Sequence, residues 1–78
     1  GETPEGALDR AAFRAALDGF LAGLEPRNRN LFLRRYWYLD SVEALARRFA
    51  MSQTQVTTTL HRLRGKLRVH LQQEGFEL

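Results

Sequence analysis

One apolar stripe constrains this chain more than any other feature. Val56, Leu60, Leu63, Leu67 and Leu71 follow one another in steps of four, three, four and four residues. Side chains at these intervals share one face of an α-helix, because the helix has about 3.6 residues per turn. The sequence therefore predicts a long C-terminal helix with one buried face, and the other elements must cover that face.

A first helix is predicted near the start of the chain. Either Asp9 or the Thr3-Pro4 pair is suited to begin it. Its expected inner face consists of apolar residues at helical spacing: Leu8, Ala12, Phe13, Ala16, Leu17, Phe20, Leu21 and Leu24.

A second helix is predicted to begin at Pro26, since a proline in the first helical turn loses no hydrogen bond. We expect this helix to run to about Tyr38. Its predicted inner face comprises Leu31, Phe32, Arg35 and Tyr36. The Tyr36-Trp37-Tyr38 run is interpreted as core with a partly exposed edge.

A short helix and a turn are predicted before the long helix. Asp40, followed three residues later by Glu43, matches a capping box that would begin a helix reaching Phe49. Residues 50–52 would form a turn. Ser52 and Gln55 match a second capping box, which would open the long helix. A short helix, a tight turn and a longer helix are typical of the helix-turn-helix motif.

The composition limits the possible classes of protein. A chain of 78 residues is long enough for one domain, so we predict a single all-α domain over residues 1–78, with four to five helices. The chain has no cysteine and its two histidines, His61 and His70, are nine residues apart, which argues against a zinc or other metal site. No acid–base pair or phosphate loop is recognisable, so we expect neither an enzyme nor a cofactor.

The longest apolar run, Tyr36 to Leu39, has four residues, which is far too short to span a membrane. The N-terminal segment also lacks the features of a signal peptide. We therefore expect a cytoplasmic location. The leading glycine, without a methionine before it, also suggests that the chain is one domain of a longer protein.

Charge is distributed unevenly along the chain. Residues 1–25 carry five acidic and two basic side chains, whereas residues 26–78 carry ten basic and four acidic ones. A basic region on a small domain is typical of proteins that bind polyanions.

The long helix would present polar side chains at its start and basic ones further along. The candidates for reading base edges, all short or medium polar groups, are Gln53, Thr54, Thr57, Thr58 and His61. The candidates for contacting phosphates are Arg62, Arg64, Lys66 and Arg68 on this helix, Arg47 and Arg48 on the short helix, and Arg34 or Arg35 before it. His70 is interpreted as a bystander. The same pattern also fits an ordinary solvated face on a bundle that binds other proteins.

Several spaced motifs occur between residues 12 and 75. They are Leu24-Glu25-Pro26-Arg27-Asn28-Arg29, Phe32-Leu33-Arg34-Arg35-Tyr36-Trp37, Ser41 to Ala46, Phe49-Ala50-Met51-Ser52, Val56, and Leu60 to Arg68. Together they resemble region 4 of the sigma-70 family of bacterial sigma factors, most closely the extracytoplasmic-function type. The resemblance implies a winged-helix-like DNA-binding fold without a wing.

The resemblance also implies a function. In this family the last helix enters the major groove of the promoter −35 element, and other faces dock on the β-subunit flap of RNA polymerase or are covered by an anti-sigma protein. By position, groove contacts would come from Gln53, Thr54, Thr57, Thr58 and His61, and backbone contacts from Arg62 and from Arg34 or Arg35.

The chain departs from the family pattern at Thr57 and Thr59, at Ala44, where the family commonly has a glutamate, and at Ala50. Thr57 and Thr59 stand where the family usually has a lysine or arginine, so fewer phosphate contacts are expected. Ala50 stands where glycine is common, at a turn position that favours left-handed backbone. Two alternatives stay open: a domain that docks on polymerase or an anti-sigma protein with little DNA binding of its own, and a dimeric repressor. We expect the isolated domain to be a monomer.

Overall fold

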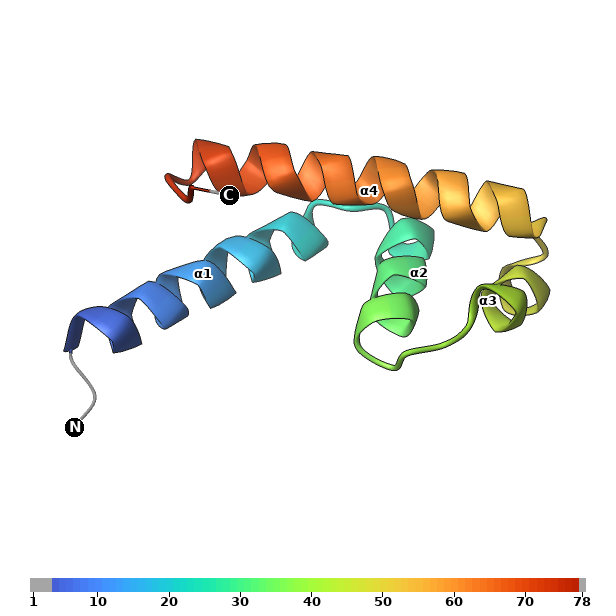
Figure 1. The fold of residues 1–78 in the computed structure, drawn as a ribbon, viewed down its shortest axis with the longest axis horizontal. Helices are drawn as coiled ribbons and strands as arrows, with labels where there is room; N and C mark the ends of the chain where they lie inside the picture. Colours follow the sequence, from blue (N-terminus) through green and yellow to red (C-terminus); the bar gives the residue numbers. More distant parts are fainter. Residues whose placement is uncertain (1–3, 78) are drawn as a thin grey trace.

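The computed structural model describes residues 4–77, and these residues form four helices without any strand (Figure 1). The helices are α1 (Pro4–Ala22), α2 (Pro26–Tyr36), α3 (Val42–Phe49) and α4 (Gln53–Gln73). The predicted all-α bundle is therefore confirmed, with the lower of the two expected helix numbers. Helix α4 runs along the molecule, and the other three helices lie on one side of it.

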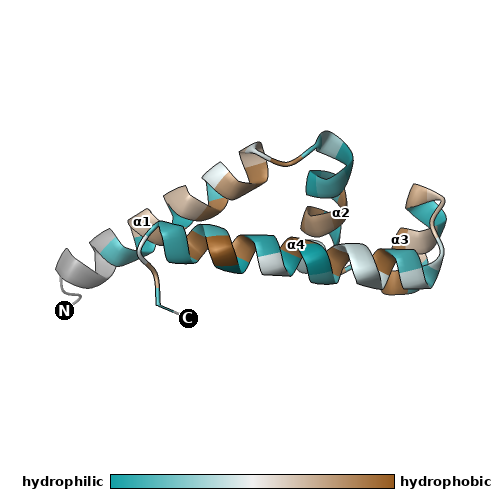
Figure 2. Ribbon diagram, turned by 90° about the horizontal axis from the view of Figure 1, so that it is seen from above, coloured by the Kyte–Doolittle hydropathy of each residue, from teal (hydrophilic) through white to brown (hydrophobic). Residues whose placement is uncertain are grey.

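The hydrophobic core consists of two clusters that share α4. The first cluster joins α2, α3 and the start of α4 through Leu31, Leu45, Val56 and Leu60. The second joins α1, α2 and the middle of α4 through Phe20, Phe32 and Leu63, with Leu67 packed against it. The predicted stripe on α4 thus faces inward, and hydrophobic and hydrophilic residues alternate along this helix in Figure 2.

Helix α1 begins before Asp9, which was one of its two predicted starting points. Its first residue is Pro4, so Asp9 lies inside the helix and does not begin it; Thr3 lies outside the described residues. Phe13 was also predicted to be buried, but it is 42 % exposed and packs edge-to-face on Phe76 of the C-terminal tail, with ring centroids 5.5 Å apart. Ala12 is likewise exposed. The reason is that the first turns of α1 diverge from α4 (Figure 1).

The second half of α1 is attached to α4 through a histidine. His70 Nε2 lies 2.9 Å from the carbonyl oxygen of Ala16, and the His70 ring centroid lies 5.9 Å from that of Phe20. The sequence did not predict this contact, by which the His70 side chain bridges two helices.

Helix α2 ends at Tyr36, two residues earlier than predicted. Leu39 adopts a left-handed backbone with φ 61°, and the Asp40 N–H donates to the carbonyl of Arg34 at 2.9 Å. This turn carries Tyr38 away from the helix. Tyr36 is exposed rather than buried, and its ring packs against Phe32 at 4.8 Å between centroids.

Candidate nucleic-acid interface

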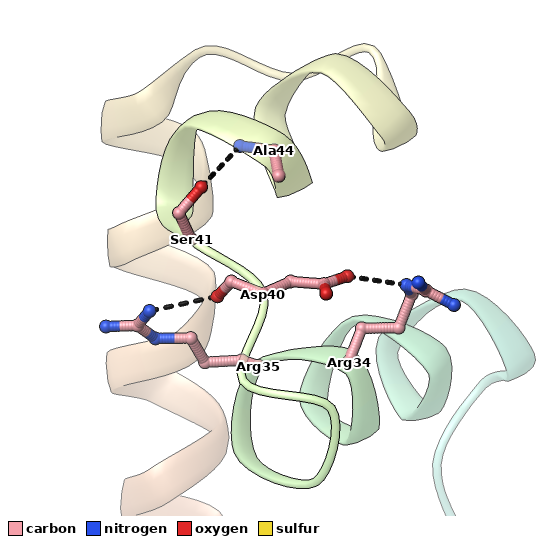
Figure 3. Close-up of polar contacts among 5 residues, drawn as sticks. All are labelled: Arg34, Arg35, Asp40, Ser41 and Ala44. Atoms are coloured by element: carbon pink, nitrogen blue, oxygen red, sulfur yellow. Dashed lines mark hydrogen bonds and ion pairs between the residues drawn. The ribbon is translucent and has the colours of Figure 1, made fainter.

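Helix α3 begins at a different residue from the one predicted. Its N-cap is Ser41, whose hydroxyl oxygen accepts a hydrogen bond from the Ala44 N–H at 3.0 Å (Figure 3). The predicted capping box of Asp40 and Glu43 is therefore wrong. Asp40 does not cap α3 because it contacts α2 instead. Its carboxylate lies 2.7 Å from Arg34 Nε, and its carbonyl accepts from Arg35 Nη1 at 3.0 Å.

The turn after α3 is stabilised from two sides. Ala50 adopts left-handed backbone with φ 53° and ψ 47°, as its position predicts, and its N–H donates to the Ala46 carbonyl. The Met51 N–H donates to the same carbonyl at 3.0 Å. From α2, Arg27 Nη2 donates to the Phe49 carbonyl at 2.6 Å. Nothing in the local sequence pattern indicated this last contact, because the two residues are 22 positions apart.

Helix α4 begins with the predicted capping box. The Gln55 N–H donates to the Ser52 hydroxyl at 3.0 Å, and the Ser52 N–H donates to Gln55 Oε1 at 2.8 Å. The segment predicted as a helix-turn-helix thus consists of α3, residues 50–52 and α4. Leu45 is buried against Val56 and Leu60 within the first core cluster.

The start of α4 presents a continuous polar surface. The five predicted groove-reading residues are all exposed, as the helical spacing predicts: Gln53, Thr54, Thr57, Thr58 and His61. Between residues 53 and 61 only Val56 and Leu60 are buried. We call these five residues the polar face. Their role in binding DNA stays a prediction.

A row of exposed residues along one side of α4 leads from the polar face to basic residues. Thr57, His61, Arg64 and Arg68 follow in steps of four, three and four, so they lie along one side of α4. All four are exposed. Arg64 Nη1 donates to the Tyr36 hydroxyl of α2, which holds its guanidinium at the edge of this row.

Arg62 and Lys66 lie on the opposite flank of α4. Both are exposed and help to line an open groove of about 750 Å³ between α4 and the end of α1, together with Gly19 and Gly23. Exposed cations therefore lie on both flanks of α4, in the turns that follow the polar face.

The remaining predicted cations fall into two groups. Arg47 and Arg48, in the last turn of α3, are exposed and therefore available to a phosphate. Arg34 and Arg35 are half-buried and held by Asp40, and the Arg34 guanidinium also lies over the Tyr38 ring at 5.3 Å from its centroid. These two arginines fix the loop before α3.

A second, apolar surface lies at the end of α2. Trp37 and Leu39 are 70 % and 78 % exposed, and Tyr38 between them is also exposed. Trp37 and Tyr38 help to line a groove of about 420 Å³ between α1 and α2, whose lining also includes Leu17, Leu21, Phe32 and Leu33. The expectation of core with an exposed edge was wrong for this run, because the chain leaves the helix at Tyr36.

In the part of the chain that the structure describes, no three histidine or acidic side chains come together as metal ligands would. None of the helices described is long and apolar enough to cross a membrane. Comparisons with protein-family models, curated proteins and solved structures found no significant match.

Proposed function

We propose that this chain binds double-stranded DNA by placing the first turns of α4 in the major groove, as the −35-reading region 4 of a bacterial sigma factor. The observation that carries the proposal is the polar face itself. Five exposed hydrogen-bonding side chains occupy the start of a helix whose opposite side is buried, and exposed cations follow them along the helix.

The dimensions of the segment support this role. Helix α4 has 21 residues and is therefore about 30 Å long, so its first turns fit a major groove about 12 Å wide while its last turns remain in the core. The N–H groups at its start offer a phosphate hydrogen-bond donors and a partial positive charge. Helix α3 would lie across the DNA backbone and brace α4.

Affinity and sequence preference would come from different residues. Arg47, Arg48, Arg62 and Lys66 would contact phosphates, which fixes the register of the protein on the duplex. The polar face would read base edges. In this role the domain directs RNA polymerase to promoters in the cytoplasm, and its other faces are available to the polymerase or to an anti-sigma protein.

Selection of bound duplexes from a randomised pool at low salt tests the proposal. An enriched sequence should emerge, and it should bind more tightly than a scrambled duplex at two salt concentrations. Arg62→Ala should weaken binding and reduce the salt slope by about one. The matched control is Arg14→Ala, which removes the same charge on α1, where Arg14 forms an exposed pair with Asp18 at 3.4 Å. Failure to enrich any sequence would overturn the proposal.

Docking on another protein is the second candidate function, and the exposed Trp37-Tyr38-Leu39 run favours it. Apolar side chains this exposed, beside an apolar groove, are typical of interaction surfaces. Titration of core RNA polymerase with labelled domain tests it. Trp37→Ala should weaken such a complex without changing DNA selection, and equal binding by both proteins would count against docking at this surface.

A dimeric repressor requires two copies that read half-sites about one DNA turn apart. Sedimentation of the domain as a monomer, with and without the selected duplex, would remove that alternative.

A further inference from the structure

We infer that Thr57 selects thymine, through contact between its methyl group and the C5-methyl group of the base. The inference rests on the proposed function and names a base preference for one position of the polar face. It follows from a hydrogen bond that the sequence alone did not reveal.

The hydroxyl of Thr57 is already engaged by its own helix. Thr57 Oγ1 donates to the carbonyl oxygen of Thr54 at a distance of 3.0 Å. A threonine hydroxyl has one hydrogen to donate, so Thr57 has none left for a base. The oxygen is also turned toward the helix backbone. The oxygen can still accept a hydrogen bond, but because it points toward the Thr54 carbonyl, the methyl group is the part of this exposed side chain that faces a ligand.

Thr57 lies on the part of α4 that enters the groove in the proposed function. It precedes His61 by one turn in the row that leads to Arg64 and Arg68, and its side chain is exposed. A base-edge contact at this position is therefore sterically open.

Neighbouring threonines differ from Thr57. Within the described residues, neither Thr54 nor Thr58 makes a side-chain hydrogen bond, so their hydroxyls keep a hydrogen to donate to bases. Of the four bases, thymine alone presents a methyl group in the major groove. An apolar group at residue 57 therefore distinguishes thymine from the other three bases, whereas a lysine or arginine there would contact phosphate.

The test compares two variants that divide the threonine side chain. Thr57→Val keeps a methyl group and removes the hydroxyl, whereas Thr57→Ser keeps the hydroxyl and removes the methyl group. Each thymine of the selected duplex is replaced in turn by uracil, which lacks only the C5-methyl group. Affinities of wild type and both variants are then measured for every duplex, with helix content checked by circular dichroism.

At one thymine, the uracil exchange should weaken binding by wild type and Thr57→Val about fourfold, the factor given by burial of one methyl-sized group. Thr57→Ser should bind the two duplexes equally, because the protein methyl group is absent. The inference is overturned if Thr57→Ser retains the discrimination, if Thr57→Val loses it, or if no thymine responds. Any of these results with an enriched sequence leaves the proposed function standing, whereas a pool without enrichment removes both.

Discussion

Ala50 holds the left-handed backbone that ends α3, with φ 53° and ψ 47°. An L-residue pays about 1–2 kcal/mol for this conformation, whereas glycine adopts it without a steric penalty. Ala50→Gly should therefore stabilise the domain by about 1 kcal/mol, measured as the free energy of unfolding in urea. A lower unfolding free energy in this variant would contradict the assignment of left-handed backbone.

Gly65 presents the opposite case, because it stands inside α4 where alanine suits the backbone better. A Cβ atom added there would meet nothing within 4 Å outside its own helix. Gly65→Ala should raise the free energy of unfolding by about 0.5–1 kcal/mol. Gly75→Ala serves as the matched control: its φ of +96° is unfavourable for alanine, so the same substitution should destabilise. Equal effects of the two substitutions would contradict this account.

At the scale of elements, the start of α4 depends on one side chain. Ser52→Ala removes the hydroxyl that accepts from the Gln55 N–H, and loss of an N-cap costs about 1 kcal/mol. The variant should unfold at lower urea concentration, with faster amide hydrogen exchange confined to the first turn of α4. Ser41→Ala should instead expose the first turn of α3, since Ser41 accepts from Ala44. Faster exchange in both turns from either variant would argue against separate caps.

Features decided within one helix can be predicted from the sequence, whereas contacts between helices cannot. The Ser52 capping box and the stripe on α4 were predicted correctly because each is decided within a few residues of one helix. The Asp40 cap was wrong because its carboxylate pairs with Arg34, a choice set by how α2 ends. The His70 bridge joins positions 54 residues apart, and no local pattern encodes such a contact.

The candidate interface likewise contains features that the sequence predicts and features that it does not. Exposure of the polar face follows from helical spacing alone. Engagement of Arg34 and Arg35 by Asp40, and of the Thr57 hydroxyl by Thr54, depends on turn geometry and side-chain conformation. These contacts decide which atoms remain free for a ligand, so the structure was required to find them.

At the scale of the whole molecule, Phe20 secures α1 to the rest of the domain. It is buried between α2 and α4, and its ring packs at 5.9 Å from Phe32. Phe20→Ala should cost about 3–5 kcal/mol, a large part of the stability of a domain this size. Phe13→Ala is the matched control, since Phe13 is exposed and contacts the tail. Urea unfolding should separate the two variants clearly; similar losses would mean that α1 is held along its whole length.

The buried core and the polar face lie on opposite sides of the first turns of α4. From residue 53 to residue 61, α4 contributes only Val56 and Leu60 to the buried core, while Leu63, Leu67 and Leu71 secure the rest of the helix. Substitutions of polar-face residues should therefore change the free energy of unfolding only slightly. Under the proposed function, a few surface mutations could therefore change which bases the domain prefers while its core stays the same.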